Sequence, residues 1–184
     1  MSMQPGTLRR PAAAVLASLI LFSTAHAEHF RFVVAFLDGT LAGTTHTGYF
    51  KTDDPCGNFK PDGPNGDRLL SLAINIDGTL FIMQDDGDFP HMPMARIQCN
   101  GYTTWFDYYA PISAAAPDRA LSMVRRDLAY NMIENTVTYS RWVDGRKVVD
   151  SRGVIFDIIP ISAREAPPEP ECLPCHSSAR VPGR

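Results

Sequence analysis

The chain has 184 residues, of which 45% are hydrophobic and 20% are charged, and its formal net charge at pH 7 is −3. This length and composition allow one domain with a sizeable hydrophobic core. They exclude the surplus of basic residues that is typical of proteins that bind nucleic acid or anionic lipid.

The first 27 residues have the organisation of a cleavable secretory signal peptide. Arg9 and Arg10 supply positive charge, residues 15–22 form an apolar run, and Ala25-His26-Ala27 offers a small-x-small cleavage site. The apolar run is shorter than the about 20 residues that a membrane-spanning helix needs, and no later segment is apolar for as long. We expect a soluble mature chain that begins at Glu28, has a net charge of about −5 without the two arginines, and is periplasmic or extracellular.

Alternating apolar residues predict short strands through most of the mature chain. The first strand would place four large side chains on one face: Phe30, Phe32, Val34 and Phe36. The alternation recurs in three later segments: 70–76, 102–108 and 154–158. Asp-Gly pairs, which favour tight hairpin turns, occur three times: 38–39, 77–78 and 144–145. These patterns predict three hairpin turns and about eight strands.

Helical spacing occurs in one segment, 117–130. Pro117 is suited to the first turn of a helix, and Leu121, Val124 and Leu128 recur at intervals of three and four residues. This segment therefore predicts one short helix at most.

Many short strands with few helical stretches indicate a mainly β fold over residues 28–162. We expect an antiparallel sandwich or a small barrel. Residues 163–184 contain five prolines among polar residues, a composition that favours extended conformations and cannot build a core. They are predicted to form a proline-rich C-terminal tail.

The chain has four cysteines, an even number that indicates oxidised or otherwise covalently used thiols in an exported protein. Cys56 lies in a predicted loop, and Cys99 ends a predicted strand 43 residues later, so we expect a disulfide between them. In the chain-entropy model it would stabilise the fold by about 4 kcal/mol. Four cysteines allow three pairings, and the sequence leaves the other two open.

The segment Cys172-Leu173-Pro174-Cys175-His176 carries the most specific chemistry in the sequence. It resembles the C-x-x-C-H haem-attachment site of c-type cytochromes. By that resemblance, Cys172 and Cys175 would bond covalently to the haem vinyl groups, and His176 would be the proximal ligand of the iron. The resemblance covers these five residues alone. Covalent attachment of haem c takes place outside the cytoplasm, in agreement with the predicted export.

Only eight residues follow His176 in this sequence, so we do not expect a conventional helical cytochrome fold there. The sixth ligand of the iron would then come from the β domain, from a partner or from solvent. The sequence offers five donors in the β domain and does not choose among them: His46, Met83, His91, Met92 and Met94.

Other roles for the tail cysteines stay open. Cys172 and Cys175 could form a local disulfide and His176 could follow them by chance. A thioredoxin-like redox site is disfavoured because prolines precede the motif where that fold has a strand. A zinc site would need two further donors nearby, and the sequence does not show them.

Three further segments have a specific and an ordinary interpretation. His91-Met92-Pro93-Met94 has ligands suited to reduced copper, but methionine more often fills gaps in a core. Asp85-Asp86-Gly87-Asp88 has carboxylates suited to calcium, but without the calcium-loop pattern it is better explained as a solvated turn. The aromatic residues within 102–109 would divide between the core and an outer surface able to bind sugar or protein.

The sequence supports two functions from different classes. The first is an exported redox protein that carries one haem c on Cys172, Cys175 and His176 and exchanges single electrons with an exported protein partner. The second is a non-enzymatic, secreted binding or structural module without a cofactor, stabilised by the Cys56–Cys99 disulfide. No hydrolase, metalloprotease or phosphate-binding motif appears, which makes an enzyme the less favoured reading.

Overall fold

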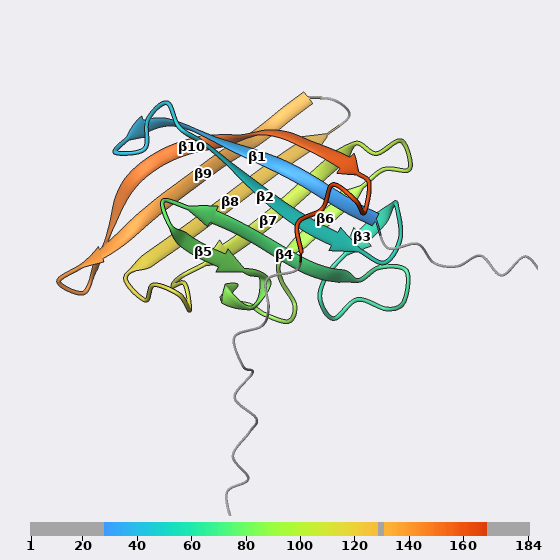
Figure 1. The fold of residues 1–184 in the computed structure, drawn as a ribbon, viewed down its shortest axis with the longest axis horizontal. Helices are drawn as coiled ribbons and strands as arrows, with labels where there is room; N and C mark the ends of the chain where they lie inside the picture. Colours follow the sequence, from blue (N-terminus) through green and yellow to red (C-terminus); the bar gives the residue numbers. More distant parts are fainter. Residues whose placement is uncertain (1–27, 129–130, 169–184) are drawn as a thin grey trace, which may run out of the picture.

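The computed structural model describes residues 28–128 and 131–168, which form one curled antiparallel sheet of ten strands (Figure 1). The strand order is β3-β6-β7-β8-β9-β10-β1-β2-β4-β5. The elements are β1 (Glu28–Gly39), β2 (Thr45–Thr52), β3 (Gly57–Phe59), β4 (Leu69–Ile76), β5 (Thr79–Ile82), the 3-10 turn η1 (Met83–Asp85), β6 (Met94–Ile97), β7 (Thr103–Ala110), β8 (Arg119–Leu128), β9 (Asn131–Val143) and β10 (Arg146–Ile161).

The mainly antiparallel β class is confirmed, and the sheet is a curled half-barrel of ten strands where we expected a sandwich or a small barrel of about eight. Strands β6 to β10 follow one another as a meander, and β10 then pairs with β1, so the first and the last strand lie side by side in the middle of the sheet. The predicted signal peptide, 1–27, lies outside the described residues. Among the residues that are described, no helix has the length and apolar character to cross a bilayer.

Two of the three predicted Asp-Gly hairpin turns are present, and the one predicted at Asp38-Gly39 is wrong because both residues still pair with β10 as part of β1. Asp77 and Gly78 between β4 and β5 have φ angles of 50° and 77°, and Asp144 and Gly145 between β9 and β10 have 50° and 72°. Two consecutive positive φ angles are the property of the tight hairpin turn whose twist matches that of the strands. Gly39 also has a positive φ, 83°, but a longer connection follows it before β2 begins.

The predicted helix at 117–130 is wrong, because residues 119–128 form strand β8. Leu121 and Met123 are fully buried on the inner face of the sheet, and β8 pairs with β7 on one side and β9 on the other. The apolar residues of this segment fit both a helical period and a strand period. The segment forms a strand because its backbone can hydrogen-bond to both β7 and β9.

Irregularities in strand pairing shift the predicted alternation in two strands. In β4 the buried residue is Leu69 rather than Leu70, next to a register shift opposite Lys51 and Thr52. In β10 the buried residue is Ile155, whereas Phe156 is 76% exposed. An extra residue at a bulge turns every following side chain to the opposite face, so the alternation of the sequence alone misplaces them.

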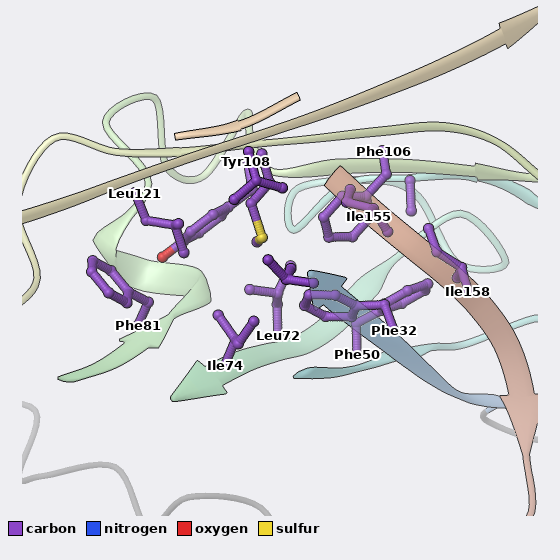
Figure 2. Packing of buried hydrophobic residues seen from close by; sticks show 14 of the residues in the cluster. Phe32, Phe50, Leu72, Ile74, Phe81, Phe106, Tyr108, Leu121, Ile155 and Ile158 are labelled. Carbon is purple, nitrogen blue, oxygen red and sulfur yellow. The ribbon is translucent and has the colours of Figure 1, made fainter. Parts of the chain in front are cut away.

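The concave inner face of the sheet is a packed core of aromatic and aliphatic side chains (Figure 2). Phe30 and Phe50 stack with their ring centroids 4.8 Å apart, and Phe32 lies 5.2 Å from Phe106. Phe81 of β5 reaches Tyr139 of β9 across the half-barrel at 6.2 Å. The side chains of the sheet itself therefore fill its interior.

Both edges of the sheet are fastened to the rest of the fold. At the β5 edge, the Tyr108 hydroxyl donates to the Ile82 carbonyl oxygen at 2.9 Å, and the Ser113 hydroxyl donates to that of Leu80 at 2.6 Å. At the β3 edge, the structure contains the predicted disulfide between Cys56 and Cys99, beside the pairing of β3 with β6. These contacts occupy backbone groups and hold short edge strands that would otherwise be open to pairing.

Candidate functional site

The start of the C-terminal tail lies over a small hollow on the outer face of the sheet. The hollow has a volume of about 50 Å³ and a mainly apolar lining. Strands β1, β2 and β4 provide its floor, with His29, Tyr49 and Ala73 among the lining residues, and Ala166–Pro168 provide a wall. In Figure 1 the segment that follows β10, drawn in red, turns back in front of β2 and β4.

A hydrogen-bonded turn after β10 directs the tail to this hollow. The Glu165 carboxylate accepts hydrogen bonds from the Ser162 backbone N–H at 2.9 Å and from the Ser162 hydroxyl at 2.8 Å. In return, the backbone N–H groups of Glu165 and Ala166 donate to the Ser162 carbonyl oxygen. The hydroxyl and then the backbone hydrogen bond of Ser162 lower the pKa of Glu165 below its usual 4.5, so the turn is best formed when Glu165 is ionised.

His29 places an imidazole in the floor of the hollow. It lies in β1 between Lys51 of β2 and Ile161 at the end of β10, and its side chain is half-buried. Within the described ranges 28–128 and 131–168, the structure gives the ring of His29 no hydrogen bond or ion pair.

The predicted haem-attachment residues Cys172, Cys175 and His176 lie outside the described residues. Pro168, the last described residue, stands four positions before Cys172 and lines the hollow. Residues 166–168 therefore lie over the outer face of β1, β2 and β4.

The five donors considered for the iron are placed elsewhere. The His46 ring lies 3.1 Å from the Thr44 hydroxyl, and Nδ1 of His91 lies 2.6 Å from the Asp62 carboxylate. Met83 is buried in the core, and Met92 and Met94 belong to the segment at the start of β6. None of these five side chains lines the hollow beneath the tail. The sequence does not single out His29, because its context shows only the polar side of an alternating strand.

The acidic segment 85–88 binds backbone groups of its own fold. Asp85 accepts hydrogen bonds from the backbone N–H groups of Ile82 and Ala114, each at 2.9 Å. Asp86 is buried and accepts from those of Asp88 at 3.0 Å and Tyr109 at 2.8 Å. Burial raises the pKa of Asp86, opposed by these two bonds. In the part of the chain that the structure describes, no three His, Cys, Asp or Glu side chains gather as a metal site.

The aromatic residues of β7 divide between the two faces of the sheet. Phe106 and Tyr108 are fully buried in the core. On the outer face, Trp105 lies between two guanidinium groups, Arg126 at 4.6 Å and Arg96 at 5.9 Å from the ring centroid. Charged side chains thus cover much of the outer aromatic surface, and the sequence alone does not reveal this.

The remaining outer aromatic residues also have charged neighbours. The Tyr102 hydroxyl donates a hydrogen bond to the Asp127 carboxylate, which is the main reason why the pKa of Tyr102 is raised. Tyr109 is 44% exposed, and the Lys147 ammonium group lies 4.9 Å from the centroid of its ring. The first contact is a hydrogen bond and the second is a cation–π interaction, and both stabilise the outer face of the sheet.

Comparison with known proteins gives no family: no protein-family model, no curated protein and no solved structure matches this chain. The function is therefore argued from the residues and their arrangement.

Proposed function

We propose that this chain is an exported redox protein that carries one haem c on its C-terminal tail and exchanges single electrons with a protein partner. The observation that carries the proposal is the sequence Cys172-Leu173-Pro174-Cys175-His176. Two thiols with two residues between them suit the two vinyl groups of one haem, and the adjacent imidazole suits an axial position on the iron. When bound, the haem supplies the one-electron chemistry.

The three side chains of the motif would hold the haem in two different ways. Cys172 and Cys175 would hold the haem through thioether bonds, each formed by addition of a thiol S–H across a vinyl group without an oxidant. His176 would be a ligand of the iron.

The described fold is compatible with such a carrier. Its interior is filled with side chains, so a haem on the tail would lie outside the core, where a protein partner can approach it. The Cys56–Cys99 disulfide fits an oxidising compartment, which is also where haem c is attached. The tail begins on the outer face of the sheet, next to the hollow.

The mass and the visible spectrum of the protein test the proposal. The full chain is expressed in cells that attach haem to exported proteins, together with a Cys172→Ala/Cys175→Ala variant. We expect the mass of the unaltered protein to rise by one haem and its Soret band to persist after denaturation, and the variant to show neither. A mass equal to that of the polypeptide alone would overturn the redox proposal.

A second function is favoured by one observation, the disulfide at the β3 edge of the sheet. A β domain fastened in this way is stable without a cofactor, as in a secreted binding or structural module whose tail is an appendage. The same mass measurement separates the two functions. The polypeptide mass, lowered only by the hydrogens lost in disulfides, would support the module.

A further inference from the structure

We propose that the seam between β9 and β10 binds an extended peptide segment of another protein as an added strand. The seam is formed by residues 131–136 of β9 and residues 154–161 of β10. Within the described part of the chain, the pairing of these two strands ends at Val137 opposite Gly153, and the seam begins there. The proposal does not depend on the haem.

Each strand of the seam is paired on one side only. β10 stays paired with β1 as far as Ile161, and β9 stays paired with β8 as far as Asn131. In Figure 1, β10 leaves the hairpin beside β9 and then bends away from it to follow β1. The seam therefore has a free strand edge on each side, and such an edge is a template for a further strand.

The hydrogen bonds at the start of the seam show which backbone groups face it. The Asn135 side-chain amide donates to the Ile155 carbonyl oxygen at 2.9 Å, and its oxygen accepts from the Ile155 N–H at 2.8 Å. Asn135 thus makes the two bonds that a neighbouring strand would make with its backbone. In an antiparallel strand, alternate residues direct these groups to the same side. Because Phe156 is an extra residue at a bulge, Ile158 and Pro160 are the next to face the seam.

The position of Pro160 agrees with this direction. Proline has no N–H, and within sheets it is found where that side of the strand is unpaired. In residues 28–128 and 131–168, the structure shows no backbone partner for the N–H and C=O groups of Ile158 or for the C=O group of Pro160 on the seam side. An added strand would satisfy these groups.

The side chains that border the seam indicate the chemistry of the peptide. Met132 and Ile133 of β9 are 50% and 60% exposed, and Phe156 of β10 is 76% exposed. Exposed apolar side chains that gather in this way are typical of an interaction site. Asp157 follows Phe156, and among the described residues its carboxylate has no hydrogen bond or ion pair. These features fit a peptide with apolar side chains and one basic residue.

The seam fits a single extended chain and not a second copy of this protein. β9 and β10 belong to the same sheet and border the seam on both sides. A strand of a folded partner carries its own neighbouring strands and would collide with one of them. A segment that is not yet part of a sheet has no such neighbours, and it gains main-chain hydrogen bonds when it binds.

Amide hydrogen exchange of the full chain tests whether the seam is free. We expect the Ile158 amide to exchange at least about tenfold faster than that of Ile159, which faces β1 opposite Arg31. Equal protection of the two amides would overturn the proposal, because the N–H of Ile158 would then already have a partner.

A display library of random seven-residue peptides is the probe for binding. We expect the selected peptides to slow the exchange of Ile158 at least about tenfold, and N-methylation of their central amides to abolish binding. Phe156→Ala and Asp157→Asn should each weaken binding at least about tenfold. Leu37→Ala is the matched control, because Leu37 is 67% exposed and lies outside the seam. A library without binders, binders that leave the exchange of Ile158 unchanged, or equal binding to all three variants would overturn the proposal.

Discussion

The ring of Phe32 lies directly against Gly48, its cross-strand neighbour on β2. A Cβ atom built on Gly48 would stand 2.1 Å from the Cζ atom of Phe32, which is far inside van der Waals contact. Phe32 itself is fully buried and packs against Phe50 and Phe106. The missing side chain at position 48 therefore makes room for an aromatic ring in the middle of the core.

Gly48→Ala should destabilise the fold although alanine costs less conformational entropy than glycine. Overpacking of a core commonly costs about 1–3 kcal/mol, more than the about 0.5–1 kcal/mol gained by replacing glycine in a strand. Urea unfolding of the two proteins measures the difference. A Phe32→Leu change, made alone and together with Gly48→Ala, should reduce the cost of the alanine. Equal costs in both backgrounds would show that the Phe32 ring is not the reason for the glycine.

Gly145→Ala should destabilise the β9–β10 hairpin through the backbone alone. Gly145 has a φ of 72°, and no atom lies within 4 Å of the position of an added Cβ. The left-handed conformation costs a residue with a side chain about 1–2 kcal/mol, and we expect a loss of that size in urea unfolding. Asp144→Asn is the control, because asparagine also tolerates a positive φ. A loss in the control as large as in Gly145→Ala would contradict this explanation.

The sequence predicts correctly those parts of the fold that depend on residues close together in the sequence. The Asp-Gly turns at 77–78 and 144–145 and the inward row from Phe30 to Phe36 follow from local rules of turn geometry and alternation. The bulge that buries Ile155 and exposes Phe156 depends on the pairing of β10 with β1, which brings together residues more than a hundred positions apart. Strand β8 was misread as a helix for the same reason.

One part of the candidate site can be predicted from the sequence and another part cannot. The motif at 172–176 is visible in the sequence because its meaning lies in the spacing of five adjacent residues. The hollow on the outer face of the sheet has no such local pattern. It depends on the turn at Ser162–Glu165, which carries Ala166–Pro168 over the outer face of β1, β2 and β4. Only the tertiary structure brings these segments together.

Removal of the Cys56–Cys99 disulfide should lower the free energy of unfolding by about 4 kcal/mol in the chain-entropy model, because the closed loop spans 43 residues of sequence. The comparison is made between Cys172→Ala/Cys175→Ala and the same protein with Cys56→Ala/Cys99→Ala added, so that the two proteins differ in this one crosslink. Urea unfolding measures the difference. A dithiol reductant should destabilise the first protein and leave the second unchanged.

A difference below about 1 kcal/mol would contradict a stabilising role for this crosslink. The fold would then be held at the β3 edge mainly by strand pairing and by contacts such as the hydrogen bond between Arg96 and Asn58. That outcome would also weaken the second function, which relies on the disulfide for a domain that is stable without a cofactor.

The exit of the tail should depend on the ionisation of Glu165. Hydrogen bonds from the Ser162 hydroxyl and backbone N–H favour the carboxylate and hold the pKa of Glu165 below 4.5 in the folded protein. A depressed pKa contributes stability that is present above pH 4.5 and is lost as the pH falls through the folded pKa. We expect the nuclear magnetic resonance signals of Ala166 and Tyr49 to move together in that acidic window.

Two variants check this dependence on Glu165. Ser162→Ala removes the largest cause of the shift and should bring the pKa of Glu165 back toward 4.5. Glu165→Gln keeps an oxygen that accepts a hydrogen bond but no longer titrates, so the signals of Ala166 should become independent of pH in the same window. If they still move in Glu165→Gln as in the unaltered protein, another group controls the turn, and the ionisation of Glu165 does not set the path of residues 166–168 over β1, β2 and β4.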